Sequence, residues 1–123
     1  MRDERSGDEI SRKVELAWLM AFYGGMLTDK QREVLTLHCE EDLSLAEIAQ
    51  EAGISRQGVH DMLSRATQRL QEMEQKLGVA ARFQRMSNGL ERCRALLREK
   101  RYDEAGSVID TLIRLDQEES NGL

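Results

Sequence analysis

The sequence predicts an all-α protein in which a helix-turn-helix domain of about four helices continues through a long helix into a C-terminal helical arm. Three observations predict this class. The 123 residues include no proline and only 4% aromatic residues. Nearly half are Ala, Glu, Lys, Leu or Arg, a composition typical of long helices. Apolar residues recur at helical spacing along most of the chain. We place the domain at residues 8–76 and the arm, a candidate dimerisation segment, at 77–118, with flexible ends at 1–7 and 119–123.

The first helix is expected over about residues 8–23. Its apolar stripe repeats at gaps of four, three and four residues: Ile10, Val14, Ala17 and Ala21. The pair Gly24-Gly25 ends this helix, because glycine adopts a left-handed C-terminal conformation without steric cost.

Two shorter helices follow, and each begins at a capping box. Thr28 and Gln31 have the spacing at which each side chain accepts a hydrogen bond from the backbone N–H of the other residue. Ser44 and Glu47 have the same spacing. The buried face of the earlier helix is expected to consist of Val34, Leu35 and His38. The later helix is expected over residues 45–52.

The helix that Ser55 caps carries a heptad seam. Its members are Val59, Leu63, Ala66, Leu70, Met73, Leu77 and Ala80. The pattern resumes with a shifted phase as Phe83, Met86, Leu90, Cys93 and Leu97. Gly78 and residues 87–89 are the weak points of this long helix. A last helix, about residues 103–115, places these on one face: Ala105, Val108, Ile109, Leu112 and Leu115.

The segment 45–63 has the spacing of a helix-turn-helix. Ala49 allows two helices to cross closely, Gly53 allows a positive φ in the tight turn, and Val59 closes the core between the helices. The rest of that core is expected to be Ile48, Ala52, Ile54 and Met62. In such motifs the second helix enters the major groove of DNA. Its candidate nucleic-acid contacts are Ser55, Arg56, Gln57, His60, Ser64 and Arg65, with Asp61 exposed among them.

Three linked stretches resemble the YlxM family of small bacterial helix-turn-helix proteins. They are residues 22–31 (FYGGMLTDKQ), residues 42–49 (DLSLAEIA), and residues 54–57 (ISRQ) together with 59–61 (VHD). The resemblance runs from about residue 10 to residue 80, and residues 27–70 are more distantly similar to the promoter-reading C-terminal region of sigma factors. It implies a regulatory protein that acts in the signal recognition particle pathway. Gly58 departs from the pattern, which has alanine there, and weakens the helix by about 1 kcal/mol.

Charge distribution argues against a protein that simply coats nucleic acid. The chain has a net charge of −5, and residues 44–76 carry 4 basic and 5 acidic groups. Residues 82–101 form a basic segment, and the tail after them is acidic. The arginines at helical spacing in the basic segment, Arg94, Arg98 and Arg101, form a candidate RNA-binding arm. The alternative is a solvated helix whose charge is balanced by the acidic residues that follow.

Catalysis, metal binding and cofactor binding have no support in the sequence. His38 and Cys39 are neighbours that point about 100° apart on a helix, and with His60 and Cys93 they lack the spacing of zinc ligands. The first residues do not resemble a secretory signal, and no apolar run approaches the ~20 residues that a membrane span requires. We therefore expect a cytoplasmic protein that is not an enzyme, does not insert into a membrane and keeps its cysteines reduced.

Three functions remain open from the sequence. The first is an accessory or regulatory factor of the signal recognition particle pathway that binds the RNA or the protein of the particle. The second is a sequence-specific DNA-binding regulator that uses the helix-turn-helix. The third is a dimeric adaptor that binds only protein. The heptad seams predict a homodimer formed through the fourth and last helices.

Overall fold

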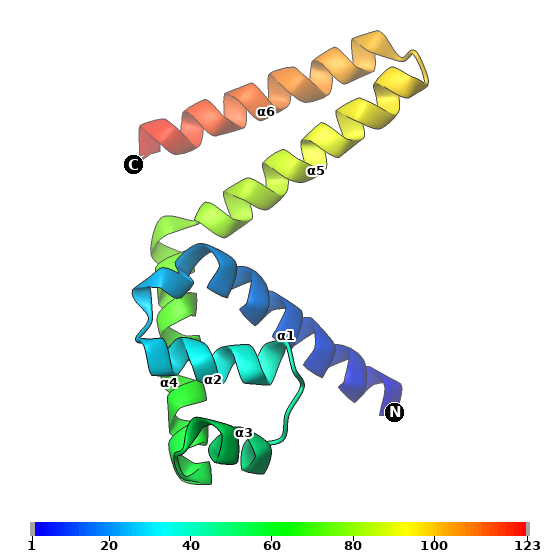
Figure 1. The fold of residues 1–123 in the computed structure, drawn as a ribbon. Helices are drawn as coiled ribbons and strands as arrows, with labels where there is room; N and C mark the ends of the chain where they lie inside the picture. The colour runs from blue at the N-terminus through cyan, green and yellow to red at the C-terminus, as the bar shows by residue number, and fades with distance from the viewer. Residues whose placement is uncertain (1, 123) are drawn as a thin grey trace. The chain divides into compact units, whose positions relative to one another are not determined.

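The computed structural model describes the backbone of residues 2–122 and the side chains of residues 7–120. Over these residues the protein has six α-helices, one short 3₁₀ helix and no strand, which confirms the predicted all-α class (Figure 1). The chain divides into two compact units, residues 1–78 and residues 79–123. None of the helices in this described part is long and apolar enough to cross a membrane.

The first unit is built around one long helix. Its elements are α1 (Arg2–Tyr23), η1 (Gly24–Met26), α2 (Asp29–Cys39), α3 (Leu45–Ala52) and α4 (Arg56–Leu77). The helices α1, α2 and α3 all pack against α4. One buried cluster joins α2, α3 and α4: Val34, Leu37, Ile48, Ala49, Ala52 and Val59. Further buried residues lie on α1, α2 and α4: Leu19, Tyr23, Leu35, Ala66 and Leu70.

Both predicted capping boxes are present. The Thr28 hydroxyl accepts a hydrogen bond from the Gln31 backbone N–H at 3.1 Å, and the Gln31 side chain accepts one from the Thr28 backbone at 3.0 Å. Ser44 and Glu47 make the same pair of bonds at 3.2 and 3.1 Å. The Ser55 hydroxyl accepts from a backbone N–H of α4. Three helix starts are therefore set by local side-chain chemistry.

The buried face of α1 differs from the predicted one, whereas that of α2 agrees with the prediction at two of three positions. Ile10 and Val14, expected inside, are 62% and 63% exposed. The buried residues of α1 are Leu19 and Tyr23 instead. On α2, Val34 and Leu35 are buried as predicted, and Leu37 is buried as well. His38, predicted on the same face, is half-buried.

The second unit is an antiparallel pair of helices, α5 (Val79–Arg98) and α6 (Tyr102–Gly122) (Figure 1). The expected long helix ends at Gly78, which has a φ of +63°. The other expected weak point, residues 87–89, lies inside the unbroken α5. The ends predicted to be flexible, 1–7 and 119–123, include residues 1 and 123, which lie outside the described residues.

The predicted apolar stripe of α5 is confirmed at Met86 and Cys93 but not at its other three positions. The helix faces α6 through Met86, Gly89, Cys93 and Leu96, whereas Leu90 and Leu97 are about half exposed. Phe83, also predicted on the stripe, is 52% exposed. The physical reason is Gly89, whose missing side chain makes room for Leu112 of α6. On α6, Ile109 is likewise more exposed than its predicted partners.

Candidate macromolecule-binding surface

The turn between α3 and α4 positions the candidate site. Gly53 ends α3 with a φ of +71°, and the backbone N–H groups of Gly53 and Ile54 both donate to the Ala49 carbonyl, at 3.0 and 3.1 Å. Ala49 and Val59 are buried where the helices meet. The small Ala49 lets α3 and α4 approach each other closely, and the left-handed backbone of Gly53 lets the chain turn sharply between them. Together these two residues hold α4 at a steep angle to α3.

The candidate nucleic-acid contacts lie on the solvent side of α4. All six are exposed: Ser55, Arg56, Gln57, His60, Ser64 and Arg65. The Gln57 amide donates to the Asp61 carboxylate at 2.9 Å, and His60 Nδ1 lies 3.7 Å from the same carboxylate. Asp61 therefore engages two polar groups of the face, and an approaching partner must compete with it or use it.

Gly58 fits the first turn of α4 closely. Its backbone N–H donates to the Ser55 hydroxyl at 2.9 Å. A Cβ at residue 58 would lie 3.1 Å from that hydroxyl oxygen, which is a tight contact. Glycine at residue 58 leaves this space open, and α4 runs through residue 58 without a break.

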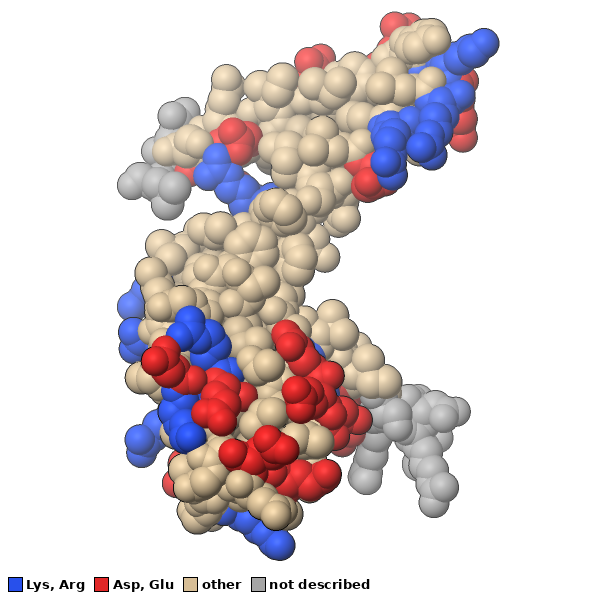
Figure 2. Space-filling model, in the orientation of Figure 1, with Lys and Arg blue, Asp and Glu red and all other residues tan. Residues whose placement is uncertain are grey.

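The first unit also exposes acidic side chains on α3 and after α2. Glu47 and Glu51 are exposed on α3, and Glu40, Glu41 and Asp42 are exposed after α2. Figure 2 shows acidic side chains gathered over one face of the first unit. Residues 1–78 contain 10 basic and 15 acidic groups, so this unit carries the net charge of −5. A phosphate backbone that approached α3 would meet repulsive charge.

The arginines of the candidate RNA-binding arm do not form one free basic surface. Arg94 pairs with Glu91 at 2.5 Å. Arg101 pairs with Glu99 at 3.0 Å and also with Glu104, and the hydrogen bonds that Arg101 donates, first to Glu104 and then to Glu99, raise the pKa of Arg101. Of the three, only Arg98 lacks an ion pair within the described part of the chain.

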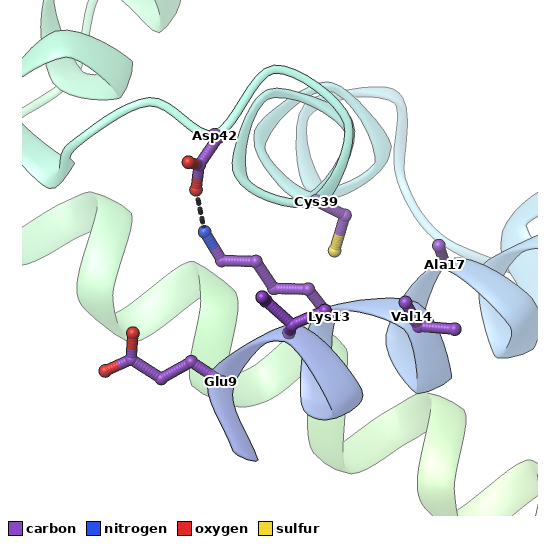
Figure 3. Close-up of a pocket in the computed structure, with 7 residues that line it drawn as sticks. Glu9, Lys13, Val14, Ala17, Cys39 and Asp42 are labelled. Atoms are coloured by element: carbon purple, nitrogen blue, oxygen red, sulfur yellow. Dashed lines mark hydrogen bonds and ion pairs between the residues drawn. The ribbon is translucent and has the colours of Figure 1, made fainter. Parts of the chain in front are cut away.

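A hollow between α1 and the end of α2 was not predicted. It has a volume of about 450 Å³ and is lined by Glu9, Ile10, Lys13, Val14, Ala17, Cys39 and Asp42 (Figure 3). Lys13 forms an ion pair with Asp42, which has a left-handed φ of 54°. The hydrogen bond from Lys13 lowers the pKa of the Asp42 carboxyl, and burial raises the pKa of the Cys39 thiol. These residues lie far apart in sequence, so no local pattern indicates the hollow.

The described side chains contain no cluster of three or more histidine, cysteine, aspartate or glutamate residues that could hold a metal ion. Burial, and secondarily the charge of Lys13, lowers the pKa of His38. This favours the neutral imidazole in the folded protein.

Comparison with known proteins gives a consistent result. A family model described as "Putative helix-turn-helix protein, YlxM / p13 like" matches residues 10–107. A UPF0122 protein of Thermoanaerobacter sp. strain X514 is 41% identical over 100 residues, which cover 78% of this chain and 86% of that protein. A UPF0122 protein of Bacillus mycoides strain KBAB4 is 34% identical over 109 residues, which cover 87% of this chain and 99% of that protein. One of Bacillus cereus strain AH187 is 33% identical over the same length.

Proposed function

Because the chain belongs to the UPF0122 family of YlxM/p13-like helix-turn-helix proteins, we propose that it is a non-enzymatic accessory protein of the signal recognition particle pathway. The pathway is the one that the resemblance to YlxM implies. The mode of action that its surface best supports is docking of the first unit onto the protein component of the particle. The helix-turn-helix then serves as a protein-binding module, a use that this scaffold permits.

The observation that carries this proposal is the combination of an exposed polar face on α4 with exposed carboxylates on α3. A protein that binds RNA must carry a basic surface to neutralise phosphates. The first unit, with its net charge of −5 and with Glu47 and Glu51 exposed on α3, complements such a surface. The same charges repel RNA itself. The ion pairs of Arg94 and Arg101 reduce the attraction of the arm for phosphates as well.

Binding to duplex DNA is the second candidate, and a different observation favours it. Ser55 caps α4 and leaves Arg56 and Gln57 exposed in the first turn, followed on the same side by His60 and Ser64. Arginine can donate two hydrogen bonds to guanine, and glutamine can pair with adenine. For such binding, Gln57 would have to exchange its hydrogen bond with Asp61 for one to a base.

Binding of the full-length chain to three separate partners distinguishes these functions. The partners are the purified protein of the signal recognition particle, its RNA, and duplexes selected from a random pool. We expect salt-sensitive binding to the particle protein that survives nuclease treatment. The double variant Glu47→Lys, Glu51→Lys should weaken it more than about tenfold, because it reverses the exposed charge of α3.

A matched control variant has the same net charge as the Glu47→Lys, Glu51→Lys variant, but its two substitutions lie outside α3. The variant Glu72→Lys, Glu118→Lys reverses two exposed carboxylates, one at the far end of α4 and one on α6. It should bind nearly as the wild type does. Equal loss in both variants, or binding of the particle RNA alone, contradicts docking onto the protein. Tight binding of a selected duplex that Arg56→Ala weakens by about 1–3 kcal/mol establishes the second candidate instead.

A further inference from the structure

The α5–α6 hairpin exposes a row of large apolar side chains on one side. The row, which we call the hairpin face, consists of Leu90, Leu97, Tyr102, Ile109 and Ile113. The exposed fractions range from 41% for Ile109 to 62% for Tyr102. A contiguous apolar surface of this kind on a small protein marks a site of interaction.

The register of the hairpin places these residues side by side. The Cys93 thiol lies 3.7 Å from the Ala105 carbonyl, Gly89 lies against Leu112, and Arg82 pairs with Asp116. In this antiparallel register Leu90 is level with Ile109, and Leu97 is level with Tyr102.

Helix geometry puts the row on a single side. On α5, Gly89 and Leu96 face α6, and the residues that come directly after them are Leu90 and Leu97. On α6, Val108 and Leu112 face α5, and the residues that come directly after them are Ile109 and Ile113. One step along a helix turns the side chain by about 100°. Because the two helices run in opposite directions, this step turns the side chains of both toward the same side of the hairpin.

The two helices also carry opposite charge. Between residues 79 and 98, α5 has five arginines and one glutamate, whereas α6 has six acidic residues and one arginine. At the end away from the turn, Arg82 and Arg85 pair with Asp116 and Glu119 across the hairpin. Figure 2 shows basic side chains gathered near the turn.

Near the turn the outer edges of the hairpin face differ in sign. Arg94 and Arg98 border the face on α5, and Asp103 and Asp110 border it on α6. Arg94 also pairs with Glu91 of its own helix and would exchange this partner for a carboxylate of the second copy. Within the described residues, Arg98 and the carboxylates of Asp103 and Asp110 form no ion pair. The hairpin face is therefore an apolar strip with one basic and one acidic edge.

We propose that the hairpin face binds a second copy of this chain, so that α5 of each copy packs against α6 of the other in a four-helix bundle. A two-fold axis parallel to the helices produces this pairing and brings Arg94 and Arg98 opposite Asp103 and Asp110 of the second copy. A two-fold axis perpendicular to the helices would instead place α5 against α5, basic edge against basic edge. The charges thus select both the partner and its orientation.

The mass of the full chain in solution tests the interface directly. Light scattering of the wild type should give twice the chain mass of 14.1 kDa. The variant Leu90→Ser, Ile109→Ser should give 14.1 kDa with an unchanged far-ultraviolet spectrum, because both side chains are exposed within one chain. As a control, Ile10→Ser alters an equally exposed apolar residue of the first unit and should leave the mass at the dimer value.

Charge reversal tests the orientation without touching the apolar residues. The variant Arg94→Glu, Arg98→Glu and the variant Asp103→Lys, Asp110→Lys should each raise the dimer dissociation constant more than about tenfold, because each turns attraction into repulsion. Mixing the two variants should restore a dimer that contains one chain of each kind. Arg92→Glu, on the opposite side of α5, serves as the control.

Two results overturn the proposal. The first is a wild-type mass of 14.1 kDa at all concentrations up to about 100 μM, far above the dissociation constant of a specific interface. The second is a dimer that persists unchanged in the charge-reversed variants, which would place the interface elsewhere or pair α5 with α5. Neither result bears on the binding of the signal recognition particle by the first unit, so the two proposals fail independently.

Discussion

The side chain of Leu112 on α6 occupies the space that a side chain on Gly89 of α5 would need. A Cβ at residue 89 would lie 2.5 Å from Leu112 Cδ2 and 2.6 Å from Leu112 Cδ1. Glycine at this position weakens α5 locally, but it lets the helices approach closely. The contact sets which side of α5 faces α6 and, in consequence, which apolar residues remain on the hairpin face.

The substitution Gly89→Ala should therefore destabilise the second unit by about 1–3 kcal/mol, because overpacking outweighs the gain in helix propensity. Hydrogen exchange of the α5 and α6 amides measures this unit directly. The control is Gly106→Ala, since a Cβ there meets nothing within 4 Å. That variant should be stabilised by about 0.5–1 kcal/mol. Protection that rises in both variants would show that the close contact does not limit packing.

The hydrogen bond between Tyr23 and Glu74 gives a second prediction. The buried Tyr23 hydroxyl donates to the Glu74 carboxylate at 2.6 Å and joins the end of α1 to α4. Tyr23→Phe should lower the free energy of unfolding of the first unit by about 1–2 kcal/mol, since a hydrogen bond to a charged acceptor is lost. Urea unfolding followed by the circular dichroism of the helices measures the change. An unchanged unfolding midpoint in Tyr23→Phe would show that this hydrogen bond does not stabilise the first unit.

The helix-turn-helix turn gives a third prediction. Gly53 has a left-handed backbone, so Gly53→Ala should destabilise the first unit by about 1–2 kcal/mol. Gly53→Asn should cost less, because asparagine tolerates this conformation better than alanine does. The midpoints of urea unfolding should follow the order glycine, asparagine, alanine. Any other order contradicts a role for backbone strain at this turn.

Local signals in the sequence predicted the helix starts and the exposed face of α4. The capping residues Thr28, Ser44 and Ser55 interact with residues only three positions away, so their effect can be read from spacing alone. Gly53 belongs to the same class, because its conformation depends on the turn itself. The all-α class and the solvent-facing residues of α4 follow from such signals.

Choices that depend on a neighbouring helix could not be predicted. The spacing of α5 fits an apolar seam through Leu90 and Leu97 as well as one through Gly89 and Leu96, and only the contact with Leu112 decides between them. The exposure of Ile10 and Val14 has the same origin, since it depends on which helices α1 packs against. The ion pairs of Arg94 and Arg101 depend on rotamers that composition does not determine.

The pair of Lys13 and Asp42 gives the last prediction. Lys13 on α1 reaches the exposed Asp42 after α2 and lowers the pKa of its carboxyl, mainly through the hydrogen bond. Burial is the main cause of the lowered pKa of His38, and the positive charge of Lys13 is the second cause. Removal of this single positive charge by Lys13→Met should therefore raise both pKa values at once, that of Asp42 toward about 3.9 and that of His38 partway toward about 6.5.

The sign of the pH dependence follows from these shifts. Asp42 and His38 both have lower pKa values in the folded protein than in the unfolded chain. The stability that results is therefore fully present above their ordinary pKa values, and it is lost as the pH falls through their pKa values in the folded protein. The wild type should therefore lose stability first below about pH 6.5, as His38 takes up a proton on unfolding, and again below about pH 3.9. NMR titration of Asp42 and His38 in wild type and Lys13→Met measures the shifts, with Lys30→Met as a control at a lysine that pairs with Glu33 instead. An Asp42 carboxyl that titrates identically in all three proteins would show that α1 and the end of α2 do not interact in solution.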